Sequence, residues 1–260
     1  MSKIVDAIAR RCGLFQPPDC ADDCKMWLSD CEEVVIKIND NVRITAWYLP
    51  VDQPSTYVIS MHGNGDCICN WAIHADALRR RYNATVLIYD YRGYGKSGGK
   101  CSLSKLVPDG ETIVRWLCRR ERCKASDIIM HGYSLGGAVT VQLAARFKSK
   151  GLVVESSFAS LGAMARPYGL CACGANFIEA RLVNYLNSTT AIERYHGVFL
   201  QCHGDADTTI SYESGRELFN ACPSKNKTFV TLRDCDHNYE YSRNYLQKQK
   251  QFFTLLSQNK

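Results

Sequence analysis

The stretch Gly132-Tyr133-Ser134-Leu135-Gly136 constrains the fold of this 260-residue chain more than any other. The apolar run Asp127–His131 before it predicts a short buried strand, and Ala138–Ala145 after it predicts a helix. A serine on so tight a strand-to-helix turn is held in a strained backbone conformation, with its hydroxyl above the sheet. Gly132 and Gly136 fit because a Cβ at either place would crowd the turn or the helix packing. In this context we interpret Ser134 as a nucleophile, with a plain strand–helix turn as the alternative.

The rest of the chain predicts an antiparallel start followed by repeated strand–helix units, and hence a mostly parallel sheet with helices on both faces. Eight strands are expected, at Val34–Ile38, Val42–Tyr48, Tyr57–Met61, Thr85–Tyr89, Asp127–His131, Leu152–Glu155, Val198–Cys202 and Thr228–Leu232. Helices are expected at Asn70–Tyr82, Leu106–Arg122, Ala138–Ala145 and Tyr212–Ala221, and from Tyr239 onward. Residues 1–29 are expected to form an N-terminal preface segment, and residues 30–260 one domain.

Composition narrows the classes of protein. Apolar residues make up 46% of the chain and charged residues 22%, which is ordinary for a soluble globular domain. No apolar run is long enough to span a membrane, and the N-terminus lacks the pattern of a signal peptide, so a cytoplasmic protein is expected. The net charge is +6, with arginine clusters at the ends of predicted helices and no nucleic-acid-binding motif, so a nucleic-acid partner is not expected.

The chain has 14 cysteines, most of which are expected to be reduced thiols. The pairs Cys67-x-Cys69 and Cys171-x-Cys173 have one residue between thiols where zinc sites usually have two, so no metal is expected. A separate hypothesis concerns the N-terminal segment up to Cys12. Its apolar face, with Ile4, Val5 and Ile8, predicts either peripheral membrane contact with Cys12 acylated, or packing on the domain.

A nucleophilic serine needs a general base, an orienting acid and an oxyanion hole. In strand–turn–helix sites of this kind the acid and then the histidine follow the serine along the chain. His196, His203 and His237 follow Ser134. His196 precedes the strand that ends at Cys202 and every plausible acid after that strand, and His203 is interpreted as part of a turn. His237 lies in a loop between the last strand and the last helix. We predict that His237 is the base, with an ordinary surface histidine as the alternative.

The acid is expected in a loop at the carboxyl end of a strand. Asp205 and Asp207 share the loop after the strand that ends at Cys202. We predict Asp207, because it lies deeper in the loop, just before the segment that returns to the next helix. Asp205 and Glu155 stay open as alternatives, and a carboxylate that is not the acid would cap a turn.

Backbone N–H groups are the expected oxyanion donors. One is that of Leu135, directly after the serine, and the other is that of Asn64, in the loop after the third strand. His62 is interpreted as a brace of this loop. The later loop that contains Asp90 and Arg92 lacks the spacing of a phosphate-binding loop, and these two side chains are expected to brace backbone groups.

Together these residues resemble the serine-hydrolase branch of the α/β-hydrolase superfamily, and within it they are similar to alpha/beta-hydrolase domain-containing proteins 13 and 17. The segments that carry the resemblance are 61–65, 89–98, 131–137, 201–207 and 236–238. The resemblance implies the α/β-hydrolase fold, with a mostly parallel eight-stranded sheet and a minimal cap. It also implies a triad of Ser134, Asp207 and His237.

The resemblance further implies hydrolysis of acyl esters or thioesters without a cofactor, with an acylated protein or a lipid as substrate. Domain-containing protein 17 removes palmitate from cysteines of membrane-associated proteins and has a dense N-terminal cysteine cluster, whereas Cys12, Cys20, Cys24 and Cys31 are dispersed here. A lysophospholipid or monoacylglycerol lipase, a small-peptide hydrolase and, from another class, a non-enzymatic binding protein stay open as alternatives.

The interval between the strands that end at Glu155 and begin at Val198 is short, about forty residues, enough for two or three short helices. Such helices are expected over residues 156–164 and 175–186. We therefore predict a shallow, open groove rather than a closed lid. Its apolar rim, which would take an acyl chain while the leaving group stays outside, consists of Leu161, Leu170, Phe177 and Ile178.

Overall fold

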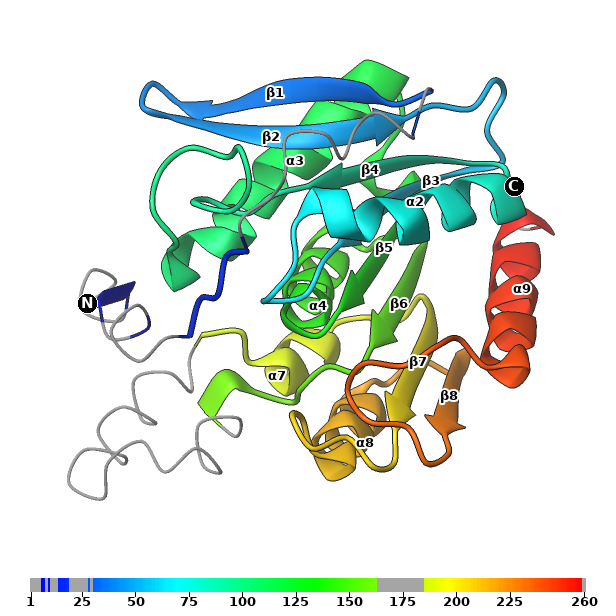
Figure 1. The fold of residues 1–260 in the computed structure, drawn as a ribbon. Helices are drawn as coiled ribbons and strands as arrows, with labels where there is room; N and C mark the ends of the chain where they lie inside the picture. Colours follow the sequence, from blue (N-terminus) through cyan, green and yellow to red (C-terminus); the bar gives the residue numbers. More distant parts are fainter. Residues whose placement is uncertain are drawn as a thin grey trace. The chain divides into compact units, whose positions relative to one another are not determined.

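The computed structural model describes residues 6, 7, 9, 14–18, 28, 30–162 and 185–258 (Figure 1). The chain forms two compact units, Met1–Ile129 (unit 1) and Met130–Lys260 (unit 2). That residues 30–260 form one domain stays a prediction.

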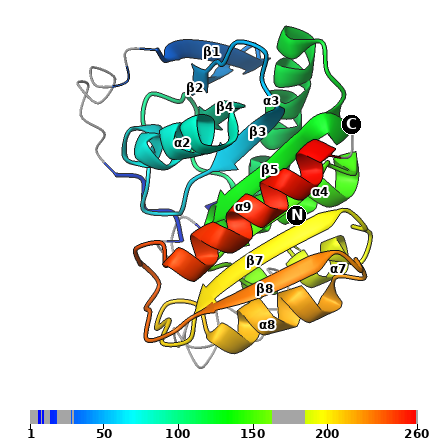
Figure 2. The same cartoon turned by 90° about the vertical axis from the view of Figure 1, so that its right-hand side faces the viewer.

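Unit 1 contains four strands in the order β1-β2-β4-β3. Their bounds are β1 Glu32–Asn39, β2 Val42–Leu49, β3 Thr56–Met61 and β4 Ala84–Tyr89. β1 and β2 form an antiparallel hairpin, β4 runs antiparallel to β2, and β3 and β4 are parallel, so the predicted antiparallel start is present. Helices α2 (Ile68–Tyr82) and α3 (Leu106–Glu121) lie on opposite sides of these strands (Figure 2). Each ends at a residue in the left-handed conformation, Asn83 and Arg122, whose N–H bonds back to the last turn.

Unit 2 contains the order β5-β6-β7-β8, with β5 beginning at the boundary between the units. Its strands are β5 Ile128–Tyr133, β6 Gly151–Glu155, β7 Val198–Gly204 and β8 Lys227–Leu232, and its helices are α4 Leu135–Phe147, α7 Ser188–Ile192, α8 Tyr212–Ala221 and α9 Arg243–Gln258. β6, β7 and β8 are parallel. Helices α4, α7 and α8 contact one another in series, and α9 packs on β7 and β8 from the other side (Figure 1). All of β6 is buried, as expected for a strand covered on both faces.

The C-terminal helix begins four residues later than the sequence predicts, at Arg243 rather than Tyr239. Ser242 accepts a hydrogen bond from the N–H of Tyr245 (3.1 Å), which satisfies one of the first N–H groups of the helix. The aromatic side chains of Tyr239 and Tyr241 bond instead to Cys202 and Glu155 of unit 2. The predicted start therefore lies in a loop whose half-buried tyrosines bond to other groups of unit 2, and not in the helix.

The described part of the N-terminal segment packs on unit 1. The carboxylate of Asp6 accepts hydrogen bonds from the N–H of Ser104 (3.0 Å) and from the hydroxyls of Ser102 (3.0 Å) and Ser104 (2.8 Å). Ala9 is also buried. This favours packing on the domain for these two positions. Ile4, Val5, Ile8 and Cys12 lie outside the described residues, so membrane contact by that face stays a prediction.

Among the described cysteines Cys67 is disulfide-bonded, which is compatible with the expectation that most of the cysteines are thiols. In unit 2 the described cysteines, Cys202, Cys222 and Cys235, carry thiols. Within the described residues there is no group of three or more His, Cys, Asp or Glu side chains placed to hold a metal ion. None of the helices in the described part of the chain combines the length and apolar character needed to cross a membrane.

The turn at the end of β5 leaves no room for a side chain at Gly132. A Cβ there would lie 2.4 Å from the carbonyl oxygen of Gly136 and 2.4 Å from Oγ1 of Thr140, whereas a Cβ at Gly65 would have nothing within 4 Å. We expect Gly132→Ala to lower the free energy of unfolding by about 3 kcal/mol, because the backbone must shift to relieve the overlap. Gly65→Ala is the control and is expected to change it by about 0.5 kcal/mol or less. Urea denaturation measures both, and equal stability of the two variants would contradict this packing.

Candidate active site

Ser134 lies at the sharp turn between β5 and α4, with φ 54° and ψ −118°. This is a strained conformation for a residue with a side chain, so neighbouring groups must hold it. The N–H of Ser134 donates to the carbonyl oxygen of Glu155 (2.8 Å), and the hydroxyl of Ser157 donates to the carbonyl oxygen of Ser134 (2.7 Å). Glu155 is the last residue of β6 and Ser157 follows it by two residues, so the end of this strand holds the serine backbone.

His237 lies in the loop between β8 and α9 and faces both Ser134 and Asp207. Its Nδ1 is 2.8 Å from Oδ2 of Asp207, and its Nε2 is 3.1 Å from Oγ of Ser134. A carboxylate can only accept, so Nδ1 carries the proton and Nε2 is left to accept from the serine hydroxyl. The arrangement is that of a nucleophile, a base and an orienting acid.

Asp207 lies in the loop between β7 and α8, and its side chain is fully buried. The N–H groups of Thr209 (2.9 Å) and Ile210 (2.8 Å) donate to its Oδ1. Its Oδ2 faces His237 and, at 3.2 Å, Nε2 of His203. Burial alone would raise the pKa of Asp207, but the donors from His203, His237 and the Ile210 backbone outweigh it and hold the pKa well below its usual range.

The other two candidate acids make different contacts. Asp205 accepts the N–H of Asp234 (2.7 Å) through Oδ1, which is the turn-capping role weighed as its alternative. Glu155 is buried at the end of β6 and bonds to Tyr241 and Tyr245 and to His131. Of the three carboxylates, Asp207 is the one that the structure brings against His237.

The predicted oxyanion donors belong to different units. Leu135 is the first residue of α4, so its N–H has no acceptor within the helix and lies at the positive end of the helix dipole. Asn64 belongs to unit 1, where its side chain donates to the carbonyl of Leu14 (2.7 Å) and accepts from the hydroxyl of Tyr94 (2.7 Å). Its place in an oxyanion hole stays a prediction.

The bracing groups expected in unit 1 are present with one difference. His62 is buried, with Nδ1 2.8 Å from the carbonyl oxygen of Gly63, and Asp90 accepts the N–H of Ile68 (2.8 Å). For Arg92, the described residues show a side-chain partner in place of the expected backbone group. Its guanidinium donates instead to the carboxylate of Asp109 on α3, with Nη2 2.7 Å from Oδ1. No pattern in the sequence indicates this partner, because Asp109 follows seventeen residues later on the buried, largely apolar face of α3.

Three further residues of unit 2 support the base and the acid, and the sequence reasoning missed them. His203, which the sequence predicts to be part of a turn, places its Nε2 2.9 Å from the carbonyl oxygen of Ile210 and 3.2 Å from Oδ2 of Asp207. Tyr133 places its hydroxyl 2.8 Å from the carbonyl oxygen of His237, and its ring packs on the imidazole. Asp236 accepts from the N–H groups of Thr208 (2.8 Å) and His237 (2.7 Å), which joins the two loops. A histidine four residues before the acid was the only available signal.

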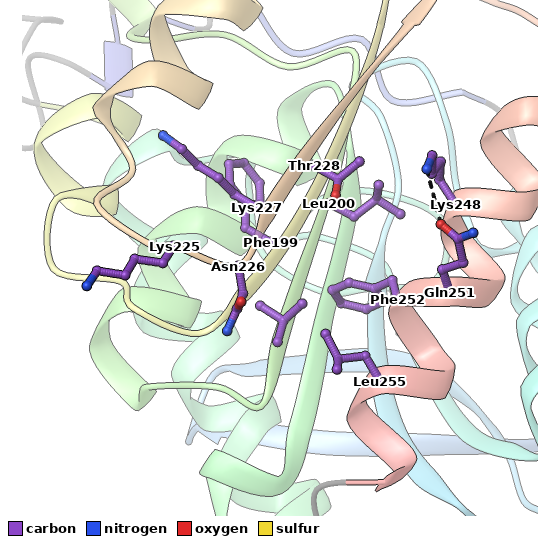
Figure 3. Close-up of a pocket in the computed structure, with 11 residues that line it drawn as sticks. Phe199, Leu200, Lys225, Asn226, Lys227, Thr228, Lys248, Gln251, Phe252 and Leu255 are labelled. Atoms are coloured by element: carbon purple, nitrogen blue, oxygen red, sulfur yellow. Dashed lines mark hydrogen bonds between the residues drawn. The ribbon is translucent and has the colours of Figure 1, made fainter.

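The groove predicted for an acyl chain is largely outside the described residues. Leu161 is buried, and Leu170, Phe177 and Ile178 are not described, so the groove stays a prediction. A different cavity, of about 300 Å³, lies between α9 and the amino ends of β7 and β8 (Figure 3). Its lining includes Lys225, Lys227 and Phe252. Asp207 follows the opposite, carboxyl end of β7, so this cavity is separate from the triad.

Comparison with known proteins places the chain in a family. Residues 52–189 match the family described as serine aminopeptidase, S33, also called Hydrolase_4. The match covers more than half of the chain and includes Ser134, and the chain therefore belongs to this family.

Named relatives agree with the assignment. Protein bem46 of Schizosaccharomyces pombe is 26% identical over 218 residues, which are 80% of this chain and 71% of that protein. Alpha/beta hydrolase domain-containing protein 17C of Xenopus tropicalis is 27% identical over 198 residues, 76% of this chain and 61% of that protein. The predicted likeness to domain-containing protein 17 is thereby confirmed.

Solved structures show the same fold. The esterase Pf2001 of Pyrococcus furiosus superposes with a TM-score of 0.71 at 22% identity, over 92% of this chain and 99% of that one. An alpha-beta hydrolase of Vibrio vulnificus gives a TM-score of 0.76 at 19% identity, over 99% and 94%. The predicted α/β-hydrolase fold is confirmed, and the protein is a hydrolase.

The contacts of Asp207 predict how stability depends on pH. A carboxyl whose pKa is lower in the folded than in the unfolded chain stabilises the fold above its unfolded value of about 3.9, and this contribution is lost as the pH falls toward the folded value. We expect wild type to lose more free energy of unfolding between pH 7 and pH 3 than Asp207→Asn does. Urea denaturation at several pH values measures it, with Asp205→Asn as the control. An equal loss in wild type and Asp207→Asn would show that Asp207 is not the stabilising carboxylate.

Proposed function

We propose that this hydrolase cleaves acyl esters or thioesters through Ser134, His237 and Asp207. The observation that carries the proposal is the hydrogen-bonded series from Oγ of Ser134 to Nε2 of His237 (3.1 Å) and from Nδ1 to Asp207 (2.8 Å). This is the arrangement that turns a weakly nucleophilic hydroxyl into an effective one.

In the proposed reaction, Oγ of Ser134 attacks the acyl carbon while His237 takes the hydroxyl proton at Nε2. Asp207 stabilises the imidazolium that forms, without taking a proton itself. The N–H of Leu135, together with the predicted donor at Asn64, stabilises the oxyanion. The leaving alcohol or thiol receives the proton from His237, and an acyl-enzyme remains. Water then attacks this acyl-enzyme with His237 again as the base, which releases the acid and restores Ser134.

The finer proposal is removal of a long acyl group, such as palmitate, from protein cysteines or from a lipid. It is supported by the relationship with domain-containing protein 17 and by the esterase names of structural neighbours. The short interval between β6 and β7 supports a substrate whose leaving group stays outside the protein. We place this activity in the cytoplasm, with peripheral membrane contact through the N-terminal segment.

One observation favours a second candidate, a small-peptide hydrolase. The family that the chain belongs to is described as serine aminopeptidase. The same three residues would cleave an amide by the same steps. An amide differs from an ester in that its nitrogen leaves less readily and needs a proton to leave. Matched substrates decide between the two: one acyl group presented as an ester, a thioester and an anilide, and one amino acid presented as an anilide with a free amine.

The first test of the proposal is Ser134→Ala. We expect the purified variant to keep its fold, to lose labelling by a fluorophosphonate probe and to lose about 10⁶-fold in kcat on any ester that the wild type cleaves. Circular dichroism, gel labelling and the matched substrate panel measure these. Hydrolysis by Ser134→Ala above the level of contaminants would rule out the nucleophile, and turnover restricted to aminoacyl anilides would favour the peptidase.

The second test compares the three carboxylates. We expect Asp207→Asn to lower kcat about 10⁴-fold, because the histidine then loses the partner that fixes its tautomer. Asp205→Asn should have the smallest effect, since that side chain caps a turn. Steady-state kinetics on one ester ranks the variants. If Asp205→Asn or Glu155→Gln proves the most damaging in kcat, Asp207 is not the acid.

A further inference from the structure

Glu155 is a buried carboxylate for which the triad has no use. It is 1% exposed, at the carboxyl end of β6. Its Oε1 lies 3.1 Å from Nε2 of His131 and accepts from the hydroxyl of Tyr245, and its Oε2 accepts from the hydroxyl of Tyr241 (2.8 Å). A buried carboxylate is costly unless it is well paired, and here both oxygens have partners.

These partners keep the group ionised. Burial alone would raise the pKa of Glu155, but the nearby His131 and the hydrogen bonds from His131, Tyr245 and Tyr241 together lower it. The carboxylate therefore accepts charge-assisted hydrogen bonds, which are stronger than those between neutral groups.

One set of contacts ties Glu155 to the nucleophile. His131 lies on β5, three residues before Ser134, and its own carbonyl is held by Thr140 of α4 (3.2 Å). The main-chain carbonyl of Glu155 accepts the N–H of Ser134 itself (2.8 Å). The side chain and the backbone of Glu155 thus hold β5 and the strained turn at the same place.

The other set of contacts ties Glu155 to the base. Between the end of β8 at Leu232 and the start of α9 at Arg243 the chain forms neither a strand nor a helix. His237 lies in this loop, so its position depends on side-chain anchors. Tyr241 belongs to the loop and Tyr245 to the first turn of α9, and both donate to the one carboxylate.

We propose that Glu155 is a positioning residue for the reaction: its carboxylate ties the loop that carries His237 to the strand that carries Ser134, and so sets the separation of base and nucleophile. The inference rests on the proposed roles of Ser134 and His237. It predicts a loss in the chemical step rather than in substrate binding, because a displacement of about 1 Å between reacting groups costs on the order of 100-fold in rate.

A purely structural role would give a different result. Any buried hydroxyl whose bonds are removed costs stability, wherever it lies in unit 2. Tyr195 supplies the matched control, because its buried hydroxyl donates to the carbonyls of Ser149 (3.3 Å) and Val198 (3.1 Å), at the amino ends of β6 and β7. Tyr195→Phe removes a hydroxyl that lies far along the strands from Glu155. Tyr241→Phe removes a hydroxyl that bonds to the Glu155 carboxylate.

The test measures the rate at which a fluorophosphonate labels Ser134 in folded protein. The serine oxygen bonds to phosphorus, fluoride leaves and the proton passes to His237, so the rate reports the nucleophile and base without a known substrate. We expect Glu155→Gln to label about 10- to 100-fold more slowly and Tyr241→Phe to slow in the same direction. Tyr195→Phe should stay within about twofold of wild type, as expected for a site apart from the chemistry.

Steady-state kinetics on an ester should show the same losses in kcat with KM unchanged. Glu155→Gln should retain more activity than Glu155→Ala, because the amide oxygen still accepts a hydrogen bond from a tyrosine hydroxyl.

Wild-type labelling rates in both Glu155→Gln and Tyr241→Phe would overturn the proposal, as would an equal slowing in Tyr195→Phe. If the Glu155 variants do not fold, the pair Tyr241→Phe and Tyr195→Phe decides. A wild type that labels rapidly but cleaves no ester would refute the proposed substrate class and leave this comparison valid.

Discussion

The backbone at Ser134 is the constraint on which the candidate site depends. A residue with φ 54° at the end of β5 turns the chain directly into α4 and points its hydroxyl out of the strand. That conformation persists only because β6 accepts the serine N–H and because glycines let the turn close. A Cβ at Gly137 would lie 2.6 Å from the Cβ of Ser157, much as one at Gly132 would meet the helix backbone. The strain is thus offset by packing and hydrogen bonds in unit 2.

Two buried carboxylates connect the loops around this turn, and each accepts several hydrogen bonds. Asp207 gathers two backbone N–H groups and two imidazoles, and it acts directly on His237. Glu155 gathers two tyrosine hydroxyls and an imidazole, and it acts on the segments to either side. Both have lowered pKa values despite burial, because the donors that surround them favour the ionised form. His237 thus contacts Asp207 through its ring, and the loop that carries it is bonded to Glu155 through Tyr241.

The strands and the order of the triad could be predicted from the sequence because they depend on local patterns. Apolar runs in β5 and β6, the glycines around Ser134 and the succession of serine, aspartate and histidine are all visible in the chain. The contacts that select among acids are not local: Asp205 and Asp207 are two residues apart and both meet the loop between β8 and α9, but Asp205 bonds to the N–H of Asp234 and Asp207 to the ring of His237. The contact of Tyr133 with His237 spans 104 residues, and a single tyrosine forms no sequence pattern that indicates its partner. The four-residue spacing of His203 and Asp207 is visible in the chain, but spacing alone does not show that the two side chains meet. The start of α9 was placed too early for the same reason, since Tyr239 and Tyr241 are apolar in pattern but bonded to buried groups of other strands.

The central claim is that Ser134 forms a covalent acyl intermediate, and trapping that intermediate tests it most directly. The wild type would be mixed with a p-nitrophenyl ester of a long acyl chain, quenched in acid within the first turnover, digested and analysed by mass spectrometry. The account predicts a burst of about one p-nitrophenol for each protein molecule and the acyl mass on the peptide that contains Ser134. Turnover of the ester with the acyl group on a different residue would contradict it. So would turnover with no burst and no acylated peptide.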